Sequence, residues 1–225
     1  MVKYLGENQE SQKKLQGILC RAYPEALARR EQPALRDILK TPIPYLDAFI
    51  EEVLRISDPT MAVSKETLCD MDILGHFVPK GTTILFCLSG PTFQQRGIPV
   101  IESTRSQSSQ KHRSDRLGDW SESNFPGDEF WPERWLRPSG DERGGDVFDS
   151  QAGPFLAFSS GTRGCWGKRL AYLELKLVVT LFLWNFVFEQ LPSQLNDWDL
   201  DDDLFVKPKH CRVKLSSARE SASGH

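Results

Sequence analysis

A single cysteine in a glycine-rich loop is the feature of this sequence with the clearest chemical potential. The loop reads Phe158-Ser-Ser-Gly-Thr-Arg-Gly-Cys-Trp-Gly167 and runs into a long apolar segment that we expect to be helical. A thiol there faces the positive end of the helix dipole and free backbone N–H groups, which both favour the thiolate that binds metals or attacks electrophiles. Arg163 and Lys168 add positive charge on either side of Cys165.

Other interpretations of Cys165 are a structural cysteine beside a turn and a catalytic nucleophile. A nucleophile needs a histidine base. The candidates are His76, His112, His210 and His225. Of these, His112 lies in a polar segment and His225 is the last residue, so both are poor candidates, and no histidine pair at helical spacing indicates a metal site.

The remaining cysteines do not form a pattern of their own. They are Cys20, Cys69, Cys87 and Cys211. Their wide spacing contains no Cys-x-x-Cys pair, so neither a zinc site nor a redox dithiol is predicted. Scattered cysteines in a chain of this size favour a reducing compartment over a disulfide scaffold.

The loop matches Phe-x-x-Gly-x-Arg-x-Cys-x-Gly at every fixed position, which resembles the haem-binding signature of the cytochrome P-450 family. The resemblance implies that Cys165 ligates haem iron as a thiolate, which pushes electron density onto the iron and favours O–O cleavage. It implies that Arg163 pairs with a haem propionate through a charge-assisted bond, and that Phe158 packs near the sulfur. The resemblance further implies that the backbone lies against the porphyrin at Gly161, Gly164 and Gly167.

A second resemblance involves Glu52-Val-Leu-Arg55. From the pattern alone these residues form a solvated i, i+3 ion pair, worth about 0.2–0.5 kcal/mol. The family carries Glu-x-x-Arg on a helix upstream of its cysteine loop, and the segment Pro-Glu-Arg134-Trp is similar to a family segment between the two. The resemblance implies that Glu52, Arg55 and Arg134 form one buried structural triad.

Further segments resemble the family, with one departure. Residues 75–82 are similar to its Gly-x-x-Ile-Pro-Lys-Gly-Thr turn, residues 45–55 to the Glu-x-x-Arg helix of fungal members, and residues 153–158 to the approach to the cysteine loop. A position after the Glu-x-x-Arg helix usually supplies an arginine to a propionate. Here that position is Lys65, which keeps the charge and loses the planar fork geometry.

Apolar periodicity predicts the elements that must position these residues. Spacings of three and four predict helices over 10–22, 34–39, 45–56 and 167–190. We expect Pro24 and the polar run to Pro33 to end the first helix.

The rest of the chain predicts strands and loops. We expect a hairpin that pairs 72–78 with 82–87 through a type I turn, with Pro79 second and a glycine fourth. Residues 102–124 predict a long polar loop, and short strands are expected at 204–206 and 211–215.

These elements and the resemblance predict a mainly α fold with small β-sheets (α+β), the C-terminal half of the cytochrome P-450 fold. We expect one haem-binding part over residues 1–215 and a disordered tail over 216–225. The family's helix over the distal haem face has no counterpart in the sequence. The sequence is therefore expected to be an N-terminally truncated chain.

Composition limits the kinds of partner that the chain could bind. The chain has 225 residues with a net charge of −3, which argues against a nucleic-acid partner. The apolar run 177–188 is shorter than the roughly 20 residues of a membrane span, so we expect a core helix and no span in this chain. With no apolar signal segment at the start, we expect an intracellular protein; intact family members are expected at the endoplasmic-reticulum membrane through an anchor that this sequence lacks.

The resemblance implies a haem-thiolate monooxygenase that inserts one oxygen atom from dioxygen into a small organic substrate. NADPH would supply electrons indirectly, through a reductase that docks near Lys168 and Arg169. Two alternatives stay open. One is a non-catalytic fragment or pseudogene product that binds haem weakly or not at all, and the other is a haem-thiolate protein that rearranges or reduces its substrate.

Overall fold

The computed structural model describes residues 1–57, 59–73, 75–88, 90, 100–112, 118, 129–140, 144–202 and 205–218. Its α-helices are α1 (Val2–Glu7), α2 (Gln9–Ala22), α3 (Pro24–Arg29), α4 (Leu35–Lys40), α5 (Pro44–Ser57), α7 (Gln107–Lys111) and α8 (Lys168–Asn185). Its strands are β1 (Ala62–Glu66), β2 (Met71–Ile73), β3 (His76–Val78), β4 (Thr83–Cys87), β5 (Leu136–Pro138), β6 (Asp146–Phe148), β7 (Phe186–Glu189), β8 (Leu200–Asp202), β9 (Val206–Pro208) and β10 (Lys214–Ser217). Single 3-10 turns are η1 (Glu102–Thr104), η3 (Pro132–Trp135), η4 (Gly161–Arg163) and η5 (Ser193–Leu195).

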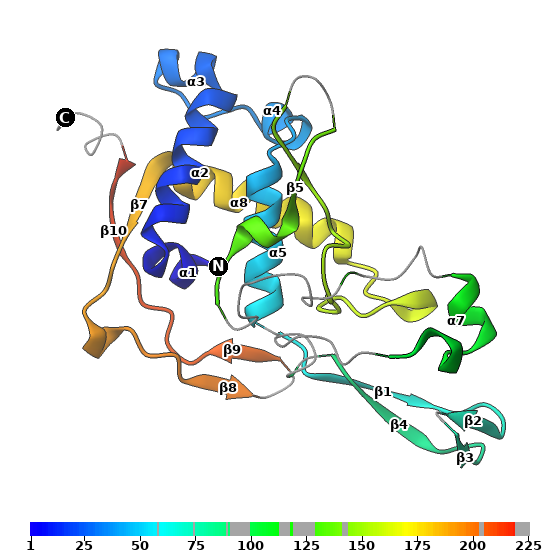
Figure 1. Cartoon of the computed structure of the whole chain (residues 1–225). Coiled ribbons are helices and arrows are strands. Elements are labelled where there is room, and N and C mark those ends of the chain that lie inside the picture. Colours follow the sequence, from blue (N-terminus) through cyan, green and yellow to red (C-terminus); the bar gives the residue numbers. More distant parts are fainter. Residues whose placement is uncertain are drawn as a thin grey trace.

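The helices build the core and the strands lie around them (Figure 1). Buried side chains of α1, α2, α4, α5, α8 and β7 form one hydrophobic cluster. A smaller cluster joins Ala48 of α5 to Trp135 and Phe155. Fold class is therefore as predicted: mainly helical, with small antiparallel sheets.

Helix α5 is central because one face carries the predicted apolar stripe. Leu46, Phe49, Ile50 and Val53 are each at most 2% exposed, and Pro44 suits the first helical position. Helices α2 and α8 pack on the same cluster through buried leucine and valine side chains, namely Leu15, Leu19, Val179 and Leu183. Burial of this stripe gives the molecule a rigid helix from which the site described below is built.

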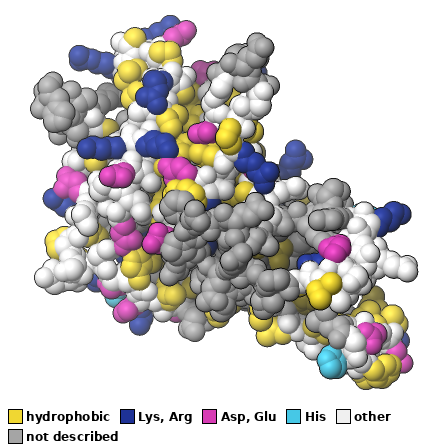
Figure 2. Space-filling model, viewed as in Figure 1, with side chains coloured by type: hydrophobic (Ala, Val, Ile, Leu, Met, Phe, Trp, Pro, Cys, Tyr) yellow, Lys and Arg dark blue, Asp and Glu magenta, His cyan; other side chains and the backbone are white. Residues whose placement is uncertain are grey.

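Each sheet of the described residues is a separate antiparallel pair. The pairs are β1–β4, β2–β3, β5–β6, β7–β10 and β8–β9. In Figure 1, β1 and β4 extend away from the helices as an arm that carries β2 and β3 at its end. Several apolar side chains of this arm are exposed, among them Leu68, Phe77 and Leu85, and apolar side chains are visible at the end of the arm in Figure 2.

The predicted hairpin was wrong. Residues 72–78 do not form one strand, because the chain reverses at Gly75, whose φ is +84° and whose N–H donates to Asp72 Oδ1 at 2.8 Å. Strand β2 therefore pairs with β3, and β4 pairs with β1. At the second turn Pro79 is the first residue, since Thr82 N donates to Pro79 O, and Gly81 is third with φ +80°. A positive φ at the third position is what a type II turn requires, so the predicted type I turn was wrong too.

The last helix ends earlier than predicted. It stops at Asn185, and the next four residues form β7, paired with β10. Gln12 of α2 binds both backbone groups of Phe188: its Oε1 accepts from Phe188 N at 2.7 Å and its Nε2 donates to Phe188 O at 2.9 Å. An apolar run fits a helix or a buried strand equally well, so periodicity alone did not reveal this change.

Other boundaries also differ from the predictions. Helix α2 ends at Ala22, before Pro24, as predicted, but Pro24 then begins the short helix α3. A proline is tolerated there because the first N–H of a helix has no partner. The segment 102–124 contains η1 and α7 in its described part, and residues 113–117 and 119–128 lie outside the described residues. Predicted strands at 204–206 and 211–215 correspond to β9 and β10, each shifted toward the C-terminus; Leu204 is outside the described residues. Strand β10 runs to Ser217, two residues into the predicted tail, while 219–225 are outside the described residues.

Candidate functional site

The cysteine loop is a tight turn that leads into α8. Cys165 N donates to Phe158 O at 2.8 Å, which closes the loop, and η4 lies between these two residues. Gly161 has a φ of +75°, and a Cβ at Gly164 would lie 3.3 Å from Gly161 O. A side chain at either position would strain the turn or crowd its backbone. The loop geometry therefore depends on these two glycines.

Cys165 is exposed at the start of α8. It lies three residues before the first helical residue, Lys168, where the unsatisfied N–H groups of a helix favour negative charge. The neighbouring Trp166 is fully exposed at 101%, and Leu170 is 58% exposed. Exposed apolar side chains thus follow Cys165 along the chain.

Glu52 is the centre of a buried network beneath this loop. Its carboxylate is 0% exposed and pairs with Arg55, with Nε to Oε2 and Nη2 to Oε1 both at 2.8 Å. Arg134 Nε lies 3.1 Å from Glu52 Oε1, so the three residues of the predicted triad are brought together. Trp131 N also donates to Oε1 at 2.9 Å, and Trp135 Nε1 donates to Oε2 at 2.8 Å.

The network balances its charges with backbone groups. One carboxylate faces two guanidinium groups, and the carbonyl of Glu129 accepts from Nη2 of Arg55 at 3.2 Å and of Arg134 at 3.0 Å. Burial lowers the pKa of Arg134, and Glu52 opposes that shift. Removal of one partner leaves a buried charge uncompensated, which costs about 3–5 kcal/mol. Sequence reasoning did not identify the two tryptophan donors, because their role depends on distance rather than spacing.

Aromatic rings connect the network to the cysteine loop. The ring centroids of Trp135 and Phe155 are 6.0 Å apart with an interplanar angle of 82°. Those of Phe155 and Phe158 are 6.5 Å apart. Edge-on and tilted contacts at such distances are favourable ring geometries. The ring of Phe155 therefore connects Phe158 to Trp135, the residue that donates to Glu52.

A second buried acid lies beside the first. Glu51 is 2% exposed, and its Oε2 accepts a short hydrogen bond from the hydroxyl of Tyr172 on α8. Burial raises the pKa of Glu51 to about 7, while Tyr172 and Lys168 oppose the shift and Asp47 adds to it. Sequence reasoning missed this pair. The available signal was a second glutamate within the apolar helix, next to the predicted triad residue.

The remaining predicted site residues lie at the surface. Arg163 and Arg169 are exposed. Lys168 is exposed as well, with Nζ 5.9 Å from the ring centroid of Phe158 and 5.8 Å from that of Tyr172. Lys65 lies on β1, outside the cysteine loop, and its Nζ is 5.6 Å from the Phe86 ring.

Comparison with known proteins identifies the family. The model of the family "Cytochrome P-450" matches residues 1–91 and 125–215. The chain belongs to the cytochrome P-450 family. It is 36% identical over 96% of its length to the cytochrome P-450 monooxygenase TRI13 of Fusarium sporotrichioides and covers 38% of that protein. It is 37% identical over 96% of its length to the monooxygenase cyp3.1 of Dothistroma septosporum, of which it covers 71%. Against the monooxygenase GME11363 of Pestalotiopsis microspora it is 39% identical over 95% of its length and covers 37%.

The donor set at Cys165 fits the haem of a cytochrome P-450. The described residues contain no group of three or more His, Cys, Asp or Glu side chains able to hold a metal ion. A lone thiolate suits a metal that brings its other ligands with it, as porphyrin does. Near the loop in the sequence, the exposed side chains of Trp166 and Leu170 are apolar and could contact a flat macrocycle. Lys168, Arg163 and Arg169 add positive charge, which suits the haem carboxylates or an acidic partner.

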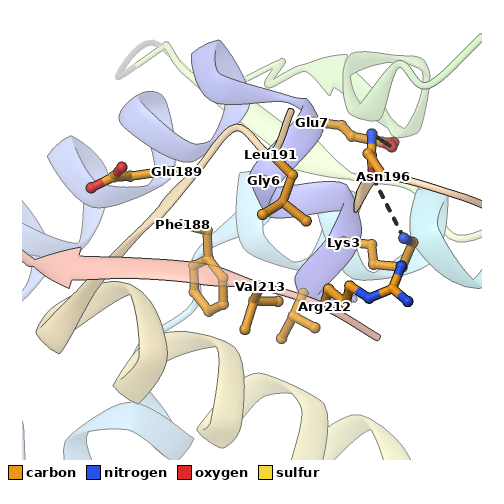
Figure 3. Close-up of a pocket in the computed structure, with 10 residues that line it drawn as sticks. Lys3, Gly6, Glu7, Phe188, Glu189, Leu191, Asn196, Arg212 and Val213 are labelled. Carbon is orange, nitrogen blue, oxygen red and sulfur yellow. Dashed lines mark hydrogen bonds between the residues drawn. The ribbon is translucent and has the colours of Figure 1, made fainter. Parts of the chain in front are cut away.

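Two further observations concern other parts of this cytochrome P-450 chain. Among the described helices, none combines the length and apolar character that crossing a bilayer requires. A hollow between α1 and the segment before β10 is lined by side chains that pair with one another (Figure 3). Lys3 Nζ lies 3.5 Å from Asn196 Oδ1 and donates to Asp197 O at 2.7 Å, and Arg212 donates to Asp197 Oδ2 at 2.7 Å. This hollow is therefore assigned a structural role.

Proposed function

We propose that this chain supplies the cysteine-thiolate side of the haem site of a monooxygenase that inserts oxygen into a small organic substrate. The observation that carries the proposal is Cys165, exposed at the start of α8 in a loop closed by the bond from its N–H to Phe158 O. The names of the fungal relatives, which are monooxygenases, support the reaction class. Since the chain spans 38% and 37% of two of them, the reaction of the whole protein is part of the proposal.

Each residue of the loop has a role in this proposal. Cys165 would hold the haem iron through its sulfur, and its position at the N-terminus of α8 favours the thiolate without a histidine base. When bound there, haem would supply dioxygen activation, which a thiolate ligand promotes. Arg163 pairs with a propionate, and Phe158 packs near the sulfur. Gly161, Gly164 and Gly167 allow the backbone to approach the macrocycle closely.

Residues farther from the sulfur hold the cysteine loop in place or form the surface on which an electron donor would dock. Glu52, Arg55 and Arg134 hold α5 to the segment that leads into the loop. Lys65 is proposed as a second propionate contact, although its ammonium group lacks the fork of an arginine. An NADPH-dependent reductase with an acidic surface would dock near Lys168 and Arg169, which are exposed beside the loop. Residues 1–215 act as one haem-binding part in this proposal.

The test is the reduced, carbon-monoxide-bound absorption spectrum of the chain after haem reconstitution, beside a Cys165→Ser control. We expect a strongly red-shifted Soret band that disappears in the control. A band that is unchanged by the substitution would refute Cys165 as the ligand. No band in either protein would favour the alternative of a fragment that does not bind haem.

A further inference from the structure

The end of α8 next to the cysteine loop is less buried than the far end. All residues of this helix are described, and the fully buried ones are Val179, Thr180 and Leu183, in its second half. In the first half Leu170 is 58% and Leu173 is 48% exposed. Packing against the core therefore fixes the far end of α8 most firmly. In the first half, Tyr172 and Leu175 are partly buried against the same core, and Lys176 Nζ donates to Thr41 O at 2.9 Å. One of these residues also makes a specific polar contact with α5.

Tyr172 supplies that contact. Its hydroxyl donates the short hydrogen bond to Glu51, which is fixed on the central helix α5 and 2% exposed. The charged groups that act on this acid are Asp47 on α5 and Lys168 on α8, and Lys176 on α8 acts in turn on Asp47. Because burial raises the pKa of Glu51 to about 7, this acid is only partly ionised near neutrality. It can therefore stay buried without a full counter-ion.

The ring of the same tyrosine contacts the cysteine loop. The centroids of Tyr172 and Phe158 are 5.3 Å apart with an interplanar angle of 43°. Phe158 in turn accepts the backbone hydrogen bond from Cys165 at 2.8 Å. One side chain thus joins α5, α8 and the loop.

Phe158 is the meeting point of two arms that start on consecutive residues of α5. One arm runs from Glu52 through Trp135 and Phe155 to Phe158. The other runs from Glu51 through Tyr172 to the same ring. Two ring contacts restrict Phe158 more than either contact alone, because a movement of the ring disturbs both.

We propose that Glu51 and Tyr172 form a second positioning arm, which fixes Phe158 and thereby the Cys165 loop in the conformation that presents the sulfur to haem. This inference rests on the proposed haem-thiolate function for its second half, the presentation to haem. Neither residue contacts the sulfur, so both are positioning residues. Their effect reaches Cys165 through the ring of Phe158 and its backbone carbonyl.

The first test needs no haem. Amide hydrogen exchange of the peptide 158–167 is compared in the unsubstituted chain, in Tyr172→Phe, which keeps the ring and loses the hydroxyl, and in Glu51→Leu. We expect exchange of the loop to speed up roughly tenfold in each variant, the effect of losing one buried hydrogen bond. In the double variant we expect no further increase, because the two groups act as one unit. Glu51→Gln keeps an oxygen acceptor for the hydroxyl and should restore the protection.

Tyr45→Phe is the matched control. It removes the hydroxyl of a buried tyrosine on α5, which donates to Ser11 of α2 at 3.3 Å, and leaves both arms intact. Loop exchange that is unchanged in Tyr172→Phe, or equally faster in Tyr45→Phe, would overturn the inference.

The second test uses the haem-reconstituted chain. The ratio of thiolate-ligated to thiol-ligated haem is read from the reduced carbon-monoxide spectrum, and we expect it to fall roughly tenfold in Tyr172→Phe, in line with the loss of one hydrogen bond. A wild-type ratio in that variant would contradict the second half of the inference. If the unsubstituted chain shows no thiolate band while the exchange effect is present, the proposed function fails and the positioning arm stands.

Discussion

The buried acid Glu51 makes a sharp prediction about stability and pH. Burial raises its pKa from 4.5 to about 7 in the folded chain. The folded state therefore holds a proton that the unfolded state releases between these two values. The contribution of this group to the free energy of unfolding is complete below about pH 4.5 and is lost as the pH rises through about 7, a change of about 3 kcal/mol. In Glu51→Gln this dependence disappears, because the amide does not titrate.

The assay is urea unfolding at several values between pH 4.5 and 8, followed by tryptophan fluorescence, for the unsubstituted chain and Glu51→Gln. The difference between the two profiles isolates this residue, since Glu189 and Asp197, whose pKa values are lowered by surface partners, occur in both. We expect the variant to gain about 3 kcal/mol relative to the unsubstituted chain across that range. Parallel profiles would show that the acid is not buried as described, and would refute the reasoning.

Further predictions concern haem loading, packing and electron transfer. Arg134→Ala should abolish haem incorporation, measured as the haem-to-protein ratio, because it leaves a buried carboxylate network broken at a cost of about 3–5 kcal/mol; normal loading would contradict the triad. Leu183→Ala should lower the free energy of unfolding by about 2–5 kcal/mol in urea, since the side chain is 1% exposed, whereas Leu170→Ala at 58% exposure should change it little. Charge reversal at Lys168 and Arg169 should slow reduction by an acidic donor at low salt and weaken its salt dependence; unchanged stopped-flow rates would count against docking there.

Local patterns predicted the helices better than the strands. The stripe of α5 was readable because five apolar residues repeat at helical spacing on one face. The strand pairing could not be read from the sequence. Strand β4 pairs with β1, and Thr67, just after β1, donates from its hydroxyl to Pro79 O at 2.7 Å. No spacing rule encodes that contact. The end of α8 at Asn185 was hidden for a similar reason: the amide of Gln12, far away in sequence, is what binds the backbone of Phe188.

The site likewise contains residues that the sequence predicted and residues that only the structure reveals. A motif with fixed spacing identified the loop around Cys165, and the resemblance named Glu52 and its two arginines, which the structure brings together. Glu51 and Tyr172 lie 121 positions apart, and a glutamate on a helix is ordinarily solvated. Its burial is a property of the assembled helices α5 and α8. Proximity of that kind becomes visible only in three dimensions.

The uneven burial of α8 has a consequence for how the proposed haem would enter this protein. The helix has 18 residues and is about 27 Å long, with one end inside the main core and the other at the surface beside the sulfur. Segments with few buried contacts open at a small fraction of the free energy needed to unfold the whole chain. The loop at the exposed end is therefore able to open while Val179 and Leu183 keep the rest of the helix folded. If haem binds at Cys165 as proposed, its insertion would be a late event on an assembled scaffold.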